Sequence, residues 1–210
     1  MPKKEAPIDQ LQQYLPEGTY HAILHYLQHY HIHLTIAKER TSILGDYRHR
    51  TSGSNHRISV NGNLNSFAFL ITLIHELAHL LTFEKFGSKI IPHGQEWKKI
   101  YGSLLEQFIK NNIFPADIEA EILKTLQNPA ASSCAEEGLT RVLHRYDKKI
   151  PGRKMVEEMS TETFFKTHDG RIFKKGSKIR KRYRCLEVST GRIYLFSPVY
   201  EAELINNFRA

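Results

Sequence analysis

The first stretch of the chain places apolar residues at helical spacing. Between Ile8 and Tyr30 they recur every three or four positions, which is the period of an amphipathic helix. Pro16 and Gly18 interrupt the period, and both residue types disfavour the interior of a helix. The pattern predicts a helical opening with a break at these two residues.

Three short runs rich in β-branched and aromatic residues follow. They cover His31–Ala37, Thr41–Arg48 and Arg57–Val60, and the turn-forming residues Ser52–Asn55 separate the second run from the third. Such runs bounded by turn residues are typical of strands. We expect the three to form a small antiparallel sheet.

The longest apolar run extends from Phe67 to Phe83 and is preceded by turn and cap residues at 61–65. It approaches the length of a membrane span, but it contains His75, Glu76 and His79, which would be costly in lipid. We therefore predict a buried helix that ends near Gly87.

Two further helices are predicted after this buried helix. One covers about Gln95 to Lys110, and the other begins at Pro115 and continues to about Leu126, since proline favours the first turn of a helix. Together with the three short strands, these helices indicate an α+β domain over residues 1–128.

The second part of the chain has a different pattern. Residues 128–138 are small and polar, which is typical of a linker. From Glu162 onward, aromatic and β-branched runs alternate with the turns Asp169-Gly170 and Thr190-Gly191, a pattern that indicates a β-meander. We predict a second, β-rich domain over residues 129–210.

Composition places the chain among ordinary globular proteins. Of its 210 residues, 40% are hydrophobic and 25% are charged, so a soluble protein with a packed core is expected. The opening MPKKEAPIDQ lacks the apolar segment of a secretion signal. Cys134 and Cys185 form neither a disulfide framework nor a cysteine zinc site, which favours the cytoplasm.

The positive charge is concentrated in the second part of the chain. The net charge is +8, and residues 141–184 alone contain 15 lysines and arginines against 5 acidic residues. A strand there would place Arg180, Arg182 and Arg184 on one face, where they could meet the phosphates of DNA without reading its bases. The alternative is a solvated basic surface. The candidate nucleic-acid contacts are Lys174, Lys175, Lys178, Arg180, Arg182 and Arg184.

The sequence His75-Glu76-Leu77-Ala78-His79 is an HExxH motif. Residues four apart share one face of a helix, so both imidazoles can bind the same zinc ion while Glu76 acts as general base. A catalytic zinc has three protein ligands and one open position. The third ligand is expected to be His93, with Glu96 as the alternative.

Three other features lie outside the HExxH motif. Trp97 is expected to pack the His93 loop onto the core. Tyr47, Arg48 and Arg50 lie on the predicted hairpin before the long apolar helix, where an edge strand could pair with an extended peptide; the alternative is a plain structural hairpin. His21, His25 and His29 share a helical face, but without neighbouring carboxylates or cysteines they are interpreted as surface residues.

Four segments occur in a fixed order: TSILGDYRHR, HRISVNGNL, LITLIHELAHLLTF and PHGQEWKKIYGSLL. Hairpin, HELAH helix and HG-x-E-W loop in this order resemble the SprT-like family, which includes the Spartan proteases that degrade proteins crosslinked to DNA. The resemblance covers about Ile32 to Leu105. It implies a zincin-like core, a zinc-dependent peptidase activity and His93 as the third ligand.

The C-terminal part departs from that family, which often carries a zinc ribbon built on paired cysteines. In YRCLEVSTGRIYLF only Cys185 is present, so one zinc is expected in the whole chain and the β-rich unit resembles a ribbon held by packing alone. The resemblance implies protein substrates, some of them held on DNA, with the basic tail providing recruitment. The alternative function is a DNA-binding scaffold with a structural zinc.

Overall fold

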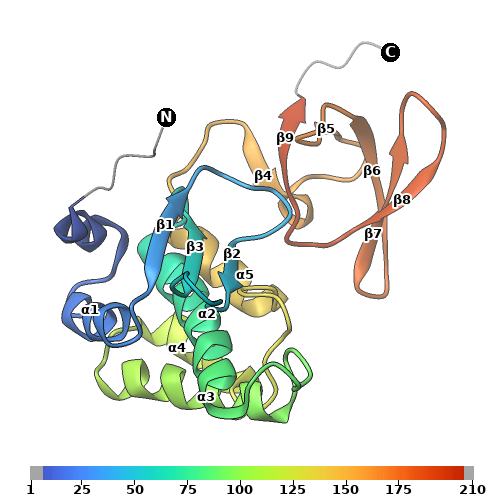
Figure 1. The fold of residues 1–210 in the computed structure, drawn as a ribbon. Coiled ribbons are helices and arrows are strands. Elements are labelled where there is room, and N and C mark those ends of the chain that lie inside the picture. The colour runs from blue at the N-terminus through green and yellow to red at the C-terminus, as the bar shows by residue number, and fades with distance from the viewer. Residues whose placement is uncertain (1–6, 206–210) are drawn as a thin grey trace. The chain divides into compact units, whose positions relative to one another are not determined.

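A computed structural model describes residues 7–205 and divides them into two compact units, 7–147 and 148–205 (Figure 1). The fold is mixed α+β, as expected. The structural division lies after Asp147 rather than after residue 128. The physical reason is that Leu139, Val142 and Leu143 are buried in the core of the first unit, so the segment that carries them belongs there.

The first unit opens with two short helical elements. A 3-10 helix η1 (Ile8–Tyr14) is followed by α1 (Tyr20–His29). The predicted break is confirmed: the chain turns between the two elements, and Gly18 adopts a φ of +81°, a left-handed conformation that glycine tolerates best.

The sheet of the first unit consists of β1 (His33–Ala37), β2 (Gly45–Arg48) and β3 (Arg57–Asn61), in the order β1-β3-β2. β3 is parallel to β1 and antiparallel to β2, so the fully antiparallel sheet predicted from the sequence is wrong. Burial explains this order: Ile58 and Val60 on β3 are almost completely buried, and the most apolar strand takes the central position.

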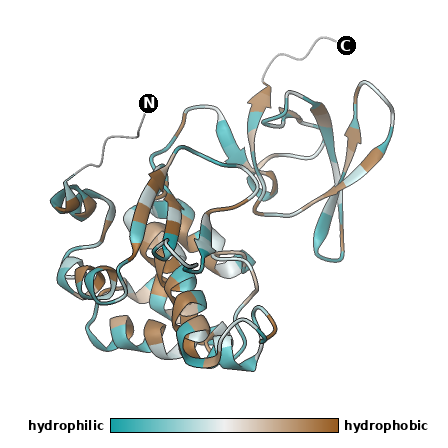
Figure 2. Ribbon diagram, viewed as in Figure 1, coloured by the Kyte–Doolittle hydropathy of each residue, from teal (hydrophilic) through white to brown (hydrophobic). Residues whose placement is uncertain are grey.

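The helix α2 (Ser66–Phe86) forms the centre of the first unit. It begins at Asn65, whose side-chain Oδ1 accepts a hydrogen bond from the Ala68 amide at 2.9 Å, and it ends at Gly87, as predicted. It is long and apolar enough to cross a membrane, but 72% of its most hydrophobic window is buried inside the protein. Figure 2 shows the many hydrophobic residues along this helix. It is the core helix of the unit.

Three further α-helices complete the first unit, and α3 packs along α2. The predicted bounds of α3 are confirmed. Its buried face includes Trp97, Tyr101 and Phe108, in agreement with its amphipathic sequence. These helices, with the 3-10 turn that ends the unit, are α3 (Gln95–Lys110), α4 (Ala116–Thr125), α5 (Glu137–Leu143) and η2 (His144–Tyr146).

The second unit is a single antiparallel sheet. The predicted meander is confirmed: β5, β6, β7 and β8 pair in sequence order, and β9 returns to pair with β5 on one side and β4 on the other. The elements are β4 (Arg153–Met155), η3 (Val156–Glu158), β5 (Phe164–Lys166), β6 (Ile172–Ile179), β7 (Arg182–Glu187), β8 (Ile193–Phe196) and β9 (Glu201–Ile205).

The core of this second unit is small and aromatic. Phe165 and Phe173 are fully buried and stack with ring centroids 5.7 Å apart, and Phe196 meets both rings edge to face. Cys185 is buried among them as a free thiol. The core of this unit contains only one cysteine and is held together by the packing of these side chains.

Candidate metal centre

Helix α2 places His75 and His79 one turn apart on the same face. Their ring centroids are 5.1 Å apart, as the i, i+4 spacing requires. His75 is 4% exposed and His79 is half-buried, so both imidazoles are at least partly withdrawn from water and need polar partners.

A third imidazole comes from the loop before α3. His93 adopts a φ of +58°, and its Nε2 atom lies 3.0 Å from Nε2 of His79 and 3.2 Å from Nε2 of His75. The ligand atoms of these three residues all lie within 4.8 Å of one another, and Glu96 is not part of this group. The geometry therefore favours His93 over Glu96 as the third ligand.

These three residues fit a zinc ion. Two nitrogens bound to one tetrahedral zinc at about 2.05 Å are separated by roughly 3.3 Å, close to the two distances between nitrogens given above. Neutral imidazoles have one acceptor nitrogen each, and three such lone pairs pointing at one position are stabilised by a shared cation. A cluster that could hold a metal is thus present, and its nitrogen donors are compatible with zinc.

The histidine cluster is strongly biased toward the neutral form that a metal requires. Burial, followed by the neighbouring His79 and His93, lowers the pKa of His75 to about 3. Burial and His93 lower the pKa of His79 to about 4. Burial and Lys98 lower the pKa of His93. Metal binding would therefore not have to compete with protons near neutral pH.

Glu76 is a buried carboxyl group beside this cluster. It is 6% exposed, and its burial, followed by the nearby charge of Asp46, raises its pKa to about 8, while Arg40 opposes the shift. The strand β2 passes directly over it: a Cβ added at Gly45 would come within 2.5 Å of Glu76 Oε1 and 2.8 Å of Thr72 Cγ2. Only glycine at this position leaves room for the carboxyl group.

The cluster and Glu76 line one cavity of about 370 Å³. One wall is formed by residues 41–47, which lead into and include most of β2, and a second wall is formed by Ala131, Ser132 and Ser133. Sequence reasoning interpreted residues 128–138 as a linker and missed this wall. Small polar residues are common in linkers, and no local pattern marks such a segment as part of a cavity.

Buried Asn61 fixes the first wall in place. Its side-chain Nδ2 donates to the carbonyl oxygens of Arg40 and Ile43 at 3.0 and 3.1 Å, and its backbone amide donates to Leu44 at 2.9 Å. The Arg40 guanidinium in turn donates to Asn61 Oδ1 at 2.7 Å and to Ser59 Oγ at 3.0 Å. The segment before β2 is thus held against β3 by a closed set of hydrogen bonds.

A polar chain supports Tyr47, which lies in the same wall. The Tyr47 ring is parallel to the His79 ring at 6.4 Å, and its hydroxyl lies 3.0 Å from Nδ1 of buried His56. Nε2 of His56 is 3.3 Å from Glu84, which also pairs with Arg50. Burial, followed by the charge of Glu84, raises the pKa of Tyr47, so the hydroxyl stays protonated and able to donate a hydrogen bond.

Trp97 packs against all three histidines. It is 1% exposed, and its ring centroid lies 4.7 Å from those of His75 and His93 and 5.3 Å from that of His79. The prediction that Trp97 holds the His93 loop on the core is confirmed. The indole therefore limits the positions that the three imidazoles can adopt.

One of the predicted nucleic-acid contacts of the second unit, Lys175, is buried. This residue is 3% exposed, donates a hydrogen bond to the Met159 carbonyl and lies over the Tyr183 ring. It pairs with Cys185 on the inner face of the sheet, so contrary to prediction it is not available to a phosphate. The other predicted cations, Lys174, Lys178, Arg180, Arg182 and Arg184, reach the surface at least in part.

The predicted alternation of arginines also differs in detail. Ile179 pairs with Arg182, so Arg180 belongs to the turn between β6 and β7, where its φ is +53°. Arg182 and Arg184 remain on one face of β7.

His25 and His29 on α1 stack on each other and are not part of a metal cluster. The part of the chain described by the structure contains one such cluster, formed by His75, His79 and His93.

Comparison with known proteins finds a family match within the first unit. The model of the SprT-like family matches residues 8–119. Protein SprT of Escherichia coli O157:H7 is 33% identical over 89 residues, and those of Escherichia coli O1:K1 and Escherichia fergusonii are 40% identical over 89 residues. These matches cover 42% of this chain and 50% of each relative, so the chain spans about half the length of the curated relatives it matches. No solved structure gives a significant match.

Proposed function

We propose that this chain, which belongs to the SprT-like family, is a zinc metallopeptidase that hydrolyses peptide bonds of protein substrates. The observation that supports the proposal is the convergence of the Nε2 atoms of His75, His79 and His93 beside the buried carboxyl group of Glu76 in one cavity. A structural zinc site has four protein ligands. Three ligands beside a carboxyl group are the arrangement of a hydrolytic site.

Each residue of the site has a distinct role in this proposal. His75, His79 and His93 would hold the zinc, which when bound supplies a Lewis acid for the scissile carbonyl and for water. Glu76 accepts the proton of the attacking water as the C–O bond forms, and it donates that proton to the amine nitrogen as the C–N bond breaks. Burial strengthens Glu76 as a base and lets it keep the proton between these two events.

The cavity walls provide a place for an extended substrate. β2 lies at the edge of its sheet in the described part of the chain, and Gly45, Asp46 and Tyr47 line the cavity. A peptide can add to such an edge through backbone hydrogen bonds, largely independent of its sequence. The hydroxyl of Tyr47 on the same wall would donate to the substrate in exchange for its contact with His56 Nδ1.

The basic second unit leads us to propose that the substrates include proteins bound or crosslinked to DNA. The hairpin between β6 and β7 exposes Lys178, Arg180, Lys181 and Arg182 within a few residues. Contacts between such cations and phosphates are indifferent to sequence and weaken with salt. We place the protein in the cytoplasm, which suits its two free cysteines.

The proposal is tested by comparing the wild type with Glu76→Gln. Zinc content is measured together with cleavage of a purified DNA-binding protein, with and without single-stranded DNA. We expect about one zinc in both proteins and a rate at least about 100-fold lower in the variant, because a general base typically contributes that much or more. Faster cleavage with DNA would support the proposed class of substrate.

A different result would favour the scaffold function. If both proteins bind zinc and neither cleaves under any of these conditions, while the wild type binds DNA, then the zinc is structural and the peptidase proposal is wrong. Cleavage that persists at the wild-type rate in Glu76→Gln would instead remove Glu76 from the catalytic role and point to a contaminating protease.

A further inference from the structure

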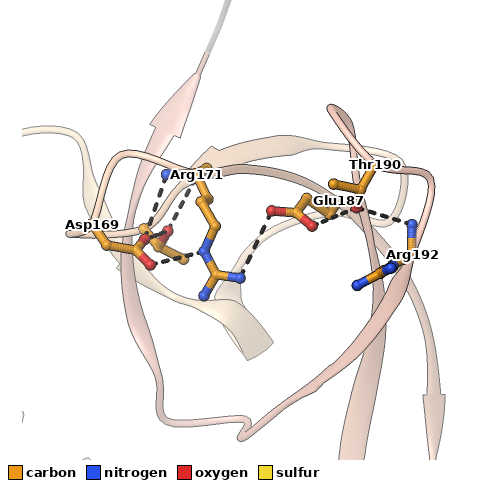
Figure 3. A network of polar contacts seen from close by, with 6 residues as sticks. Asp169, Arg171, Glu187, Thr190 and Arg192 are labelled. Atoms are coloured by element: carbon orange, nitrogen blue, oxygen red, sulfur yellow. Dashed lines mark hydrogen bonds and ion pairs between the residues drawn. The ribbon is translucent and has the colours of Figure 1, made fainter.

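Each unit contains a network of polar side chains around a buried residue, and the two networks differ in where they end. The network of the second unit stays within its sheet (Figure 3). Buried Glu187 pairs with Arg171 at 3.7 Å and accepts a hydrogen bond from the Thr190 hydroxyl. Arg171 also pairs with Asp169 at 2.8 Å. These contacts join the two turns that carry Asp169 and Thr190, so this network stabilises the sheet.

The network of the first unit ends at the metal centre instead. It passes from Glu84 to buried His56 and from His56 to the hydroxyl of Tyr47. The Tyr47 ring then lies parallel to the imidazole of His79, with centroids 6.4 Å apart, and aromatic rings interact up to about 7 Å. A histidine that is not a candidate ligand is thus connected to one that is, through a single tyrosine.

The hydrogen bonds of His56 fix the position of its one ring proton. The backbone amide of Arg50 donates to Nδ1 of His56 at 3.3 Å, so Nδ1 is an acceptor and the proton belongs on Nε2. Nε2 then donates to Glu84 Oε1 at 3.3 Å. The Tyr47 hydroxyl, 3.0 Å from Nδ1, is a donor as well. The hydrogen bonds of the chain therefore all run in one direction, from Tyr47 toward Glu84.

His56 is itself fixed in position. Its backbone carbonyl accepts a hydrogen bond from the His33 amide of β1 at 2.8 Å. Glu84, at the other side of the ring, is held by Arg50, whose Nε lies 3.3 Å from Oε1. Burial lowers the pKa of His56 more than Glu84 raises it, so the ring stays neutral and Nδ1 stays an acceptor. The Tyr47 hydroxyl is thus bound to a fixed point.

His79 is the candidate ligand on α2 that burial fixes less, since it is half-buried and His75 is 4% exposed. Among the described residues, its side chain hydrogen-bonds only to His93, through the Nε2 atom that would bind the metal. Apart from the other two ligands, the described rings beside its imidazole are those of Trp97 and Tyr47. Trp97 is fixed by burial in the core. The position of Tyr47 depends on its hydrogen bond.

We propose that His56 is a positioning residue of the metal centre: by accepting the Tyr47 hydroxyl, it holds the Tyr47 ring where that ring orients the imidazole of His79. The inference rests on the zinc site of the proposed function. A metal-bound histidine is usually oriented by a hydrogen bond to its other ring nitrogen. Here an aromatic ring held by a second histidine takes that role, and the exchange of the Tyr47 hydrogen bond for one to substrate follows only after the metal is bound.

The test measures the dissociation constant of zinc in the full-length protein, by competition with a chromophoric chelator at neutral pH. His56→Leu should bind zinc at least about tenfold more weakly than the wild type, as is typical when a partner that orients a ligand is lost. His56→Asn places an amide oxygen near the position of Nδ1 and should restore the affinity to within about threefold. His49→Asn is the matched control. His49 lies on the same loop and stacks on Phe83 at 4.8 Å, and its loss should leave zinc affinity unchanged.

Tyr47→Phe separates positioning from general damage to the fold. It keeps the ring and removes the hydroxyl, so it should weaken zinc binding about as much as His56→Leu does. The double variant should bind no more weakly than either single variant, because both changes break the same hydrogen bond. Circular dichroism at the temperature of the zinc measurement shows whether each variant is folded. If His56→Leu does not fold, the comparison of Tyr47→Phe with the wild type decides.

Long-range ¹H–¹⁵N NMR spectra provide a readout that does not depend on the metal. They should show His56 as the neutral tautomer with its proton on Nε2, and a proton on Nδ1 would overturn the proposal. It is also overturned if the wild type binds zinc and folded His56→Leu or Tyr47→Phe binds it equally well, or if the two losses add in the double variant. A wild type that binds no zinc would overturn the proposed function itself, and this inference with it.

Discussion

At the scale of single residues, the candidate site depends on one glycine as much as on its histidines. Gly45 lets β2 pass so close to α2 that a methyl group in its place would lie 2.5 Å from Glu76 Oε1. This closeness places the first wall of the cavity over the carboxyl group and excludes water from one side of it. The environment that raises the pKa of Glu76 to about 8 is therefore partly made by the absence of a side chain.

Gly45→Ala should reduce peptidase activity by about 100-fold or more while zinc content is retained. The added methyl group must displace Glu76 or separate β2 from α2, and a misplacement of about 1 Å at a reacting group can lower a rate to this extent. The three atoms nearest to the methyl group belong to Glu76 and Thr72, and none belongs to a candidate metal ligand. Cleavage rate and zinc content of the same preparation provide the measurement.

Gly53→Ala is the control for this prediction. It also adds one methyl group to a glycine near β2, but nothing lies within 4 Å of the new Cβ. Its φ of +94° makes the substitution strained, so some stability will be lost without a change at Glu76. Wild-type activity in Gly45→Ala would show that Glu76 has more room than the structure gives it.

The sequence could identify some of these residues and not others, for a physical reason. His75, Glu76 and His79 are recognisable because their geometry follows from the spacing within one helix. The role of Gly45 depends on a contact between two elements distant in the chain, and no local pattern encodes it. The prediction for Lys175 is wrong for the same reason. A lysine in a basic run is expected on the surface, but the pairing of Lys175 with buried Cys185 on the neighbouring strand places it on the inner face of the sheet.

At the scale of elements, Asn65 connects the start of α2 to the end of the first unit. Its Oδ1 accepts from the Ala68 amide at 2.9 Å, and its Nδ2 donates to the Leu143 carbonyl at 3.0 Å and to Asp147 Oδ1 at 2.7 Å. One side chain thus caps the helix that carries the metal ligands and holds the last helical turns against it.

Asn65→Ala should lower the free energy of unfolding of the first unit by about 2 to 3 kcal/mol. Loss of a helix cap costs about 1 kcal/mol, and each of the two other hydrogen bonds contributes about 1 kcal/mol. Urea unfolding followed by the fluorescence of Trp97, the only tryptophan, reports on this unit alone. Asn65→Asp keeps the cap but loses both donors and faces Asp147, so it separates the two contributions. If Asp and Ala variants are as stable as the wild type, the contacts of Asn65 are not stabilising.

Element bounds were more predictable than element partners. The bounds of α3 and the end of α2 at Gly87 followed from periodicity and from cap residues, which act locally. The position of β3 between β1 and β2 did not, because strand order is decided by which strand buries the most apolar surface, here through Ile58 and Val60. The segment at 131–133 was likewise given the wrong role, since its small residues contact the cavity rather than connect domains.

At the scale of the whole molecule, the two units differ in what stabilises them. The candidate zinc ligands all belong to the first unit. The second unit depends on an aromatic core and on the ion network around Glu187. A ligand that binds only the folded form stabilises the unit that binds it. Metal availability should therefore change the stability of one unit and leave the other as it is.

Removal of zinc with EDTA should destabilise the first unit selectively. Zinc at 1,000 times its dissociation constant stabilises the folded form by about 4 kcal/mol. Hydrogen exchange followed by mass spectrometry should show faster exchange in α2 and α3 after zinc removal and unchanged exchange in β5 to β8.

In EDTA, a lower pH should destabilise the first unit further. His75 has a pKa of about 3 when folded against an ordinary value of 6.5, so between these values the unfolded chain binds a proton that the folded chain does not. Stability falls by roughly 1.4 kcal/mol per pH unit for such a histidine, and His79→Gln should reduce this slope. Equal acceleration in β5 to β8 would contradict the independence of the units, and no change in α2 would contradict the zinc site.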